Sequence, residues 1–143
     1  MMRAVTYRGY GPPSVLTLRE VPTPAPGADE VLVRVVASSV NDYDWHLLTG
    51  KPWLIRAPGF TKPANTVLGS DVAGRVEAVG SGVTRFAVGD GVYADFSPHG
   101  FGAFAEYVAA PQAALSHKPV CLTFEQAAAV PQAGELAVMA CTR

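Results

Sequence analysis

The sequence predicts a mainly β domain with short helices, either a sandwich or a partly open β-barrel. Segments of alternating apolar and polar residues recur along the chain, turn-forming residues separate them, and few segments have a helical period. The 143 residues include 14 glycines and 12 prolines, a composition that suits many short strands joined by turns. A chain of this length buries about two-thirds of its unfolded surface, which is enough for one core.

The expected strands follow one another from the N-terminus. They cover residues 2–7, 15–21, 30–40, 67–79, 89–96 and 103–109, with a further one at 113–118. In the clearest of them, Val31, Val33 and Val35 fall on one face. Prolines and a glycine at 22–27 predict a stiff exposed connection. Residues 51–66 have no period and are expected to form a loop with apolar tips.

Two segments are expected to be helical. Residues 41–49 predict one or two helical turns, with Asn41 as the N-cap and Gly50 closing the helix. Residues 124–130 predict a second helix, because Thr123 and the glutamine three positions later form a capping-box pattern. No internal repeat or interior domain boundary interrupts the chain.

Composition excludes several classes of function. The formal net charge is −1 without a basic patch, which argues against nucleic acid as a partner. No apolar run approaches the roughly 20 residues that cross a bilayer, and the start does not resemble a signal peptide, so we expect a cytoplasmic protein that does not bind membranes. Cys121 and Cys141 cannot supply a disulfide framework and are expected to be a loop thiol and a helix thiol.

A dense group of polar side chains follows the strand at 30–40. An amide, a phenol, a carboxylate, an indole and an imidazole occur within six positions, at Asn41, Tyr43, Asp44, Trp45 and His46. Residues three apart share a helix face, so Asn41 is expected beside Asp44, and Tyr43 beside His46. The group is either a functional site or a structural one, in which Asp44 caps backbone amides, Trp45 packs in the core and His46 is a surface residue.

Three stretches carry a family resemblance. Residues 37–45, 68–80 and 88–93 resemble, in order and spacing, the N-terminal catalytic domain of the medium-chain dehydrogenase/reductase superfamily, as do 29–35, 102–108 and 123–131. The resemblance implies a GroES-like domain over residues 1–123. It also implies that 124–143 begin a helical link to a Rossmann nucleotide-binding domain that is absent from this chain. In agreement, no glycine-rich dinucleotide fingerprint follows a strand.

The resemblance is to the zinc-independent, quinone oxidoreductase-like branch. Zinc alcohol dehydrogenases have a metal-binding Cys where Asn41 stands, and His-Glu where this chain has Ser70 and Asp71. A catalytic zinc needs three ligands of the Cys, His or Glu type, and a structural zinc needs four close cysteines, which residues 81–110 lack. No zinc is therefore expected, and no residue is assigned to a metal.

The resemblance also implies an activity. The relatives use NADPH or NADH, bound mostly by the Rossmann domain that is missing here, to reduce quinones or α,β-unsaturated carbonyls by hydride transfer. Their Asn-Pro-x-Asp motif lines the cleft floor, and here Asn41 and Asp44 match it while Asp42 replaces the proline. Leu136 stands where relatives often carry a threonine that contacts the nicotinamide. The candidate residues are Asn41, Tyr43 and Asp44 for catalysis, Asn41, His46 and Pro131 for the cofactor, and Trp45, Ser70 and Phe101 for the substrate.

Other interpretations stay open. The chain is alternatively a non-catalytic GroES-like module for binding or oligomerisation, or a fragment of an enoyl reductase from a larger synthase. The expected partners are a small apolar carbonyl or quinone and either a second copy of the chain or a separate Rossmann-type protein. Gly74 and Gly80 are interpreted as structural glycines. Phe104 and Tyr107 are interpreted as core aromatics, whereas His99 and Phe101 fit either the core or a substrate wall.

Overall fold

The computed structural model describes residues 1–56 and 59–142; positions 57–58 of the expected loop and 143 of the expected link lie outside the described residues. The strands are β1 (Met2–Thr6), β2 (Thr17–Val21), β3 (Glu30–Ala37), β4 (Asp71–Val79), β5 (Gly91–Asp95), β6 (Tyr107–Pro111) and β7 (Ser116–His117). The helices are α1 (Asp42–Thr49), α2 (Phe124–Ala128) and α3 (Pro131–Cys141). The mainly β class with short helices is confirmed.

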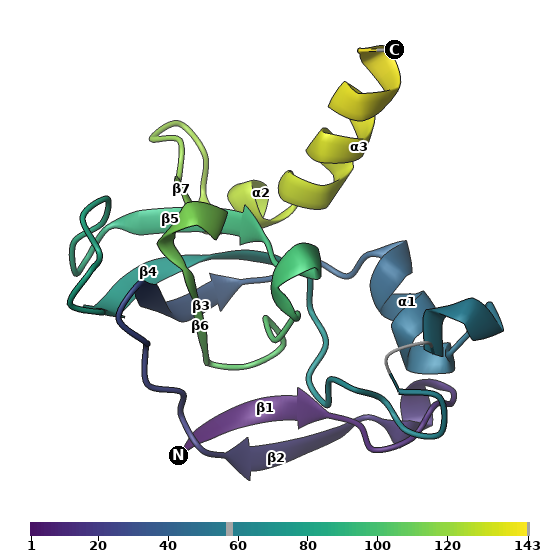
Figure 1. Ribbon diagram of the computed structural model, residues 1–143. Coiled ribbons are helices and arrows are strands. Elements are labelled where there is room, and N and C mark those ends of the chain that lie inside the picture. The colour runs from purple at the N-terminus through teal and green to yellow at the C-terminus, as the bar shows by residue number, and fades with distance from the viewer. Residues whose placement is uncertain (57–58, 143) are drawn as a thin grey trace.

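Over the described residues, the strands form two open sheets (Figure 1). The larger is antiparallel and has the order β6-β3-β4-β5-β7, while β1 and β2 pair as a separate antiparallel ribbon. Single bridges between Ala4 and Ala105 and between Thr6 and Val67 join the ribbon to the rest. The arrangement is therefore a partly open one.

The core lies against one face of the larger sheet, and α2 covers part of the other. Alternating residues of the strands bury their side chains in the core, including Val31, Val33, Val72, Val76, Val92 and Phe96. On the opposite face, Ala127 and Ala128 of α2 pack against Ala73 of β4. Phe104 packs against a third cluster around Tyr7, Leu48 and Leu68, as expected for a core aromatic.

Strand ends differ from the predicted ones where backbone geometry changes. Strand β4 begins at residue 71 instead of 67, because Gly69 has φ of 100° and turns the chain before the ladder starts. Strand β6 covers 107–111 instead of 103–109, because Gly102, with φ of 112°, precedes a segment that makes only one bridge. These left-handed conformations suit glycine and cannot continue a strand.

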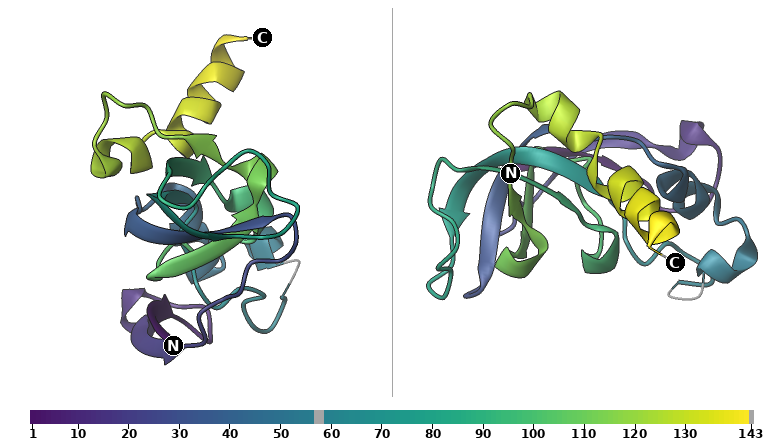
Figure 2. Two further views of the ribbon diagram at one scale, coloured as in Figure 1. Left: turned by 90° about the vertical axis from the view of Figure 1, so that its left-hand side faces the viewer. Right: turned by 90° about the horizontal axis from the view of Figure 1, so that it is seen from above.

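Helices α1 and α2 begin at the predicted capping residues, and the helix predicted at 124–130 ends early, before a separate helix α3. Helix α1 has Asn41 as its N-cap and Gly50 as a left-handed C-cap, and α2 has the predicted capping box from Thr123. The helix predicted at 124–130 ends at 128, because Pro131 lacks an N–H group and instead occupies the first position of α3. Figures 1 and 2 show α3 projecting away from the sheets.

The close packing of β3 on β4 requires glycine at one position. A Cβ at Gly74 would lie 2.2 Å from the carbonyl oxygen of Arg34 on the neighbouring strand. Gly80 is as crowded, since a Cβ there would lie 1.9 Å from the carbonyl oxygen of Gly27. Both glycines therefore serve the close approach of another backbone, as interpreted from the sequence.

Candidate functional site

Residues from three parts of the chain meet where β3 ends and β4 begins. Ala37 pairs with Ala73, so the residues after β3 lie beside those before and at the start of β4. This pairing brings Asn41 next to Ser70 and Asp71, about thirty positions away in sequence. The N-terminus of α3 reaches the same point.

The side chain of Asn41 is held by three acceptors. Its Nδ2 atom lies 2.9 Å from Ser70 Oγ, 3.1 Å from Asp71 Oδ2 and 3.2 Å from Ser39 Oγ. An amide nitrogen carries only two hydrogens, so all of its donor capacity is directed into the protein. The orientation of the Asn41 amide is therefore fixed, and Ser70, which is buried, supports it instead of lining an open surface.

Asp44 is buried and accepts hydrogen bonds from backbone amides. It is 2% exposed, and its carboxylate receives the N–H of Asn41 at 3.0 Å and that of Gly69 at 2.9 Å. Burial raises the pKa of Asp44, and the two amide donors oppose that rise. The structural alternative, in which Asp44 caps backbone amides, thus describes its contacts, while a catalytic role for Asp44 stays a prediction.

Asp71 is the residue at this site that was not among the predicted site residues. It is fully buried, and its Oδ2 atom accepts a hydrogen bond from the Ser39 hydroxyl at 2.9 Å and another from the Asn41 amide. Its Oδ1 atom receives the backbone N–H of Gln132 in α3 at 3.0 Å. Burial raises the pKa of Asp71 against these hydrogen bonds. The sequence did carry a signal for this role, which is a carboxylate at the start of an apolar strand. A carboxylate in such a place is buried only where hydrogen-bond partners surround it.

Two hollows adjoin Tyr43. One, of about 360 Å³, lies between α1 and α3 and is lined by Tyr43 and His46 together with Gln132, Leu136 and Met139 and neighbouring polar residues; we call it the α1–α3 groove. The other, of about 310 Å³, is lined by Tyr7, Tyr10, Tyr43, Ile55 and Phe101, among others. Tyr43 therefore stands between a partly polar groove and an aromatic one.

Tyr43 and Phe101 form the wall between α1 and the glycine-containing loop. Their rings meet edge to face with centroids 5.4 Å apart, and Phe101 adopts a φ of 65°, which is unusual for a residue other than glycine. Tyr43 remains 39% exposed. The Phe101 ring thus lies in the aromatic hollow rather than in the core, which keeps the substrate-wall interpretation open.

His46 contacts two acceptors at the rim of the groove. Its Nδ1 atom lies 2.6 Å from the carbonyl oxygen of Lys51, and its Nε2 atom lies 3.1 Å from Asp42 Oδ2. A carbonyl oxygen only accepts, so Nδ1 carries the hydrogen. The ring is therefore held in one orientation beside Tyr43, on the same side of α1 as predicted.

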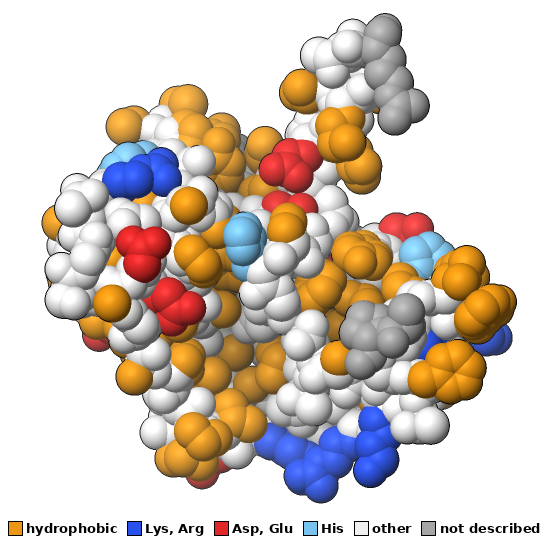
Figure 3. Space-filling view, in the orientation of Figure 1, with side chains coloured by type: hydrophobic (Ala, Val, Ile, Leu, Met, Phe, Trp, Pro, Cys, Tyr) orange, Lys and Arg blue, Asp and Glu red, His pale blue; other side chains and the backbone are white. Residues whose placement is uncertain are grey.

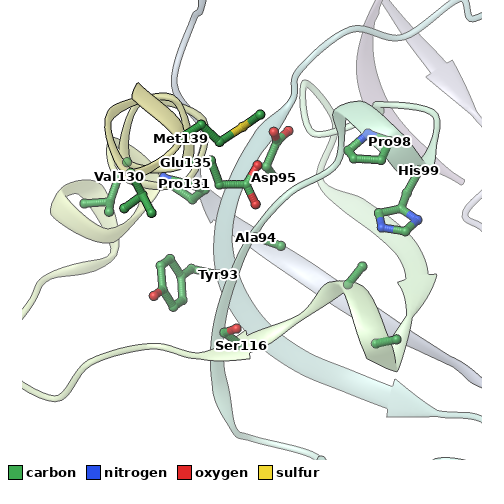
Figure 4. Close-up of a pocket in the computed structure, with 14 residues that line it drawn as sticks. Tyr93, Ala94, Asp95, Pro98, His99, Ser116, Val130, Pro131, Glu135 and Met139 are labelled. Atoms are coloured by element: carbon green, nitrogen blue, oxygen red, sulfur yellow. The ribbon is translucent and has the colours of Figure 1, made fainter. Parts of the chain in front are cut away.

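A larger hollow of about 780 Å³ lies along α3 and β5 (Figure 4). Figure 4 shows Asp95 and Glu135 beside one another, with Met139 above them and Tyr93 and Ser116 farther along. The Asp95 carboxylate accepts hydrogen bonds from the N–H and the hydroxyl of Ser97. Pro131 lines this hollow, and His99 lies at its other side. Pro131 thus lines a different hollow from Tyr43 and His46, although the next residue, Gln132, donates its N–H to the carboxylate that holds Asn41.

The remaining predicted residue lies elsewhere. Trp45 is 48% exposed and lines none of these three hollows in the described part of the chain. The two cysteines are exposed free thiols, one in a loop and one at the end of α3, as predicted. The face between α1 and α3 presents hydrophobic side chains with acidic and histidine side chains among them (Figure 3). No helix of residues 1–56 and 59–142 is apolar and long enough to span a bilayer.

Comparison with known proteins gives consistent matches. Residues 27–120 match the model of the alcohol dehydrogenase GroES-like domain. The whole chain is 40% identical over 146 residues to a chloroplastic quinone oxidoreductase of Triphysaria versicolor and spans 43% of that protein. It is 39% identical over 143 residues to a chloroplastic NADPH-dependent alkenal/one oxidoreductase of Arabidopsis thaliana, with 95% of this chain covering 36% of that protein.

The solved structures agree. The quinone oxidoreductase from Coxiella burnetii superposes with a TM-score of 0.88 at 33% identity, over 97% of this chain and 44% of that chain. The chain thus spans well under half the length of the proteins that it matches.

Proposed function

Because this chain belongs to the alcohol dehydrogenase GroES-like domain family of the medium-chain dehydrogenases/reductases, we propose that it is the substrate-side domain of a zinc-independent oxidoreductase. Its reaction would be the NAD(P)H-dependent reduction of quinones or α,β-unsaturated carbonyls. The observation that carries the proposal is the α1–α3 groove with Tyr43 in its wall, on a helix whose start is fixed by the Asn41 amide and its partners Ser70 and Asp71. The names of the relatives, quinone and alkenal/one oxidoreductases, support the same reaction class.

The α1–α3 groove fits the nicotinamide end of the cofactor. A nicotinamide ring is flat and apolar and bears a polar amide, and the groove offers the side chains of Leu136 and Met139 together with the polar groups of His46 and Gln132. When bound, the cofactor supplies a hydride. The chain's own contribution is to orient the ring, to exclude water and to polarise the substrate carbonyl.

The donor to the substrate carbonyl is Tyr43 in this proposal. Both hydrogens of Asn41 Nδ2 already point at protein acceptors, so that amide cannot donate to a ligand without breaking a buried bond. The Tyr43 phenol is partly exposed and borders both hollows, so it can reach a ligand in either. A hydrogen bond from this phenol stabilises the negative charge that develops on the carbonyl oxygen, and Asn41 serves to hold the start of α1.

Zinc independence rests on the chemistry of Asn41 and Ser70. An amide and a hydroxyl are poor ligands for zinc compared with thiolate and imidazole. The two side chains also bond each other at 2.9 Å, which satisfies them without a metal. Addition of zinc or of a chelator is therefore expected to leave activity unchanged.

A titration with NADPH, followed by tryptophan fluorescence, tests the proposal, with quinone-dependent NADPH oxidation measured in the same sample. Trp45 belongs to α1, which forms one wall of the groove, so energy transfer from this indole to bound NADPH is the signal. Tyr43→Phe is expected to lower kcat/KM by about a hundredfold or more, whereas Tyr107→Phe, which removes the same hydroxyl from β6, is expected to have no effect. Equal turnover of Tyr43→Phe and wild type would contradict the role of the phenol.

A second candidate function, a binding or oligomerisation module, rests on α3. Its Leu136, Val138 and Met139 side chains are each 62% exposed on the projecting helix. Large exposed apolar surface favours association with another protein surface. No NADPH binding at millimolar concentration, together with a concentration-dependent dimer in analytical ultracentrifugation, would favour this candidate over the oxidoreductase.

A further inference from the structure

We propose that Asp71 is a positioning residue that joins the two walls of the α1–α3 groove, by holding Asn41 with one carboxylate oxygen and the first turn of α3 with the other. Oδ2 receives Asn41 Nδ2 at 3.1 Å, and Oδ1 receives the N–H of Gln132 at 3.0 Å. The inference rests on the proposed function only in so far as this groove binds the nicotinamide.

The first step is that α3 lacks a cap of its own. Its N-cap residue is Val130, whose side chain cannot accept a hydrogen bond from the first-turn amides. Asp71 supplies the missing acceptor from a position 61 residues earlier in the chain. A carboxylate is the favourable group for this place, because the N-terminus of a helix carries partial positive charge.

The second step is that, besides its contact with β5, little packing fixes the direction of α3. Only Pro131 of this helix is buried, and the rest projects from the domain (Figures 1 and 2). A helix of eleven residues is marginal in water without packing, so the contacts at its N-terminus decide where it points. Pro131 and the bond from Gln132 to Asp71 are such contacts.

The third step is that α3 supplies one wall of the groove and α1 the other. Gln132, Leu136 and Met139 come from α3, whereas Tyr43 and His46 come from α1. Asn41 starts α1, and its side chain is bound to the same carboxylate that receives α3. Asp71 therefore sets the distance between the walls, whereas the Asp44 carboxylate accepts the backbone N–H groups of Asn41 and Gly69, at the start of α1 and before β4.

Asp71→Asn and Asp44→Asn form a matched pair for the test. Each replaces one acceptor oxygen of a buried carboxylate by a nitrogen that cannot accept. In Asp71→Asn the remaining oxygen is expected to face Asn41 and Ser39, because two donors point at Oδ2 and one at Oδ1, so the new nitrogen lies opposite the Gln132 N–H. We expect the Gln132 amide to exchange with solvent about tenfold to a hundredfold faster in Asp71→Asn, as loss of a charged hydrogen bond implies, with no change in Asp44→Asn. In Asp44→Asn, the amide of either Asn41 or Gly69 should exchange faster, because each of the two Asp44 oxygens receives one of them. The Val76 amide, bonded to the Asp90 carbonyl oxygen, reports whether each variant is folded.

A second variant separates positioning from simple capping. Val130→Asp in the Asp71→Asn background gives α3 a local cap, which restores the stability of the helix but not its link to Asn41. We expect protection of the Gln132 amide to return, while NADPH binding stays about tenfold weaker than in wild type. If Asp71→Asn does not fold, the Gln132 amide of wild type and of Asp44→Asn carries the test, and exchange there as fast as at the exposed amides of an unfolded chain would overturn the proposal.

The outcomes distinguish the proposal from the function on which it rests. Unchanged Gln132 exchange in Asp71→Asn, equal acceleration in Asp44→Asn, or full recovery of NADPH affinity by the local cap would overturn the positioning role. A wild-type chain that binds no NADPH and forms the concentration-dependent dimer would favour the binding module over the proposed function, and amide exchange would then decide whether Asp71 holds α3.

Discussion

Replacement of Gly74 by alanine tests how closely β3 and β4 approach beneath the site. The added Cβ would lie 2.2 Å from the carbonyl oxygen of Arg34 and 2.8 Å from Val33 Cγ1. Real Cβ atoms essentially never come within 3.0 Å of another heavy atom, so the strands must separate by at least 0.8 Å at this point. The backbone of Arg34 cannot rotate away, because it is part of the ladder on both sides.

The expected cost follows from this displacement. Overpacking of a close-packed interior costs about 1–3 kcal/mol, and stretching of adjacent ladder hydrogen bonds adds about 1 kcal/mol. The free energy of unfolding should therefore fall by about 2–4 kcal/mol. With a urea m-value of about 2 kcal/mol per molar, the midpoint should fall by about 1–2 M.

Urea unfolding followed by circular dichroism measures the change. Gly9→Ala is the matched control, because a Cβ at Gly9 would meet nothing within 4 Å. This control is expected to be neutral or to stabilise by about 0.5 kcal/mol through the unfolded state. A Gly74→Ala midpoint within about 0.2 M of the control would refute the argument from close approach. The same strands lead to Asn41 and Asp71, so a lowered NADPH affinity in this variant is expected as well.

Three further results are expected. Burial raises the pKa of Tyr7 from 10.0 to about 12, so its contribution to stability is complete below pH 10 and is lost as the pH rises through 12. Unfolding of wild type between pH 9 and pH 12 should therefore show a loss of up to about 2–3 kcal/mol that Tyr7→Phe lacks; parallel curves would contradict this. Thr123→Ala removes the N-cap of α2 and should cost about 1 kcal/mol in urea unfolding, and an unchanged midpoint would show that packing of Ala127 and Ala128 alone holds this helix. Burial raises the pKa of Asp71 above 3.8, so its contribution to stability is complete below that pH and is lost as the pH rises through the folded-state pKa. Asp71→Asn should flatten this part of the stability curve measured from pH 3 to 7, and identical pH profiles would count against burial as the cause.

The elements of the fold were largely predictable, because their signals are local. Alternation located every strand, and Asn41, Gly50 and Thr123 marked helix ends by the chemistry of their own side chains and backbone. The predicted ends failed at Gly69 and Gly102, where a positive φ interrupts an apolar run that otherwise continues. Periodicity records which side chains are apolar and does not record the sign of a backbone angle.

The candidate site was predictable only in part. The cluster after β3 located Asn41, Tyr43 and His46, but their roles depend on contacts with distant residues. Asp44 is charged and yet buried against the Gly69 amide, whereas Trp45 is aromatic and yet partly exposed. The two residues are neighbours in the same helix, so their residue types alone predict the wrong burial for both. A short helix offers several faces, and only the surrounding packing decides which of them meets the core.

The sequence by itself determined that this chain forms a mainly β domain of a known family. The zinc-independent branch was an interpretation of Asn41 and Ser70 from resemblance, and it stays a prediction. Only the tertiary structure decided that the Asp71 carboxylate accepts one hydrogen bond from the Asn41 amide and another from the first turn of α3. The physical reason is range: alternation, caps and turns act over a few residues, whereas a buried carboxylate is satisfied by whichever donors the fold brings to it. The donor from Gln132 comes from 61 positions away, and no local pattern specifies that approach.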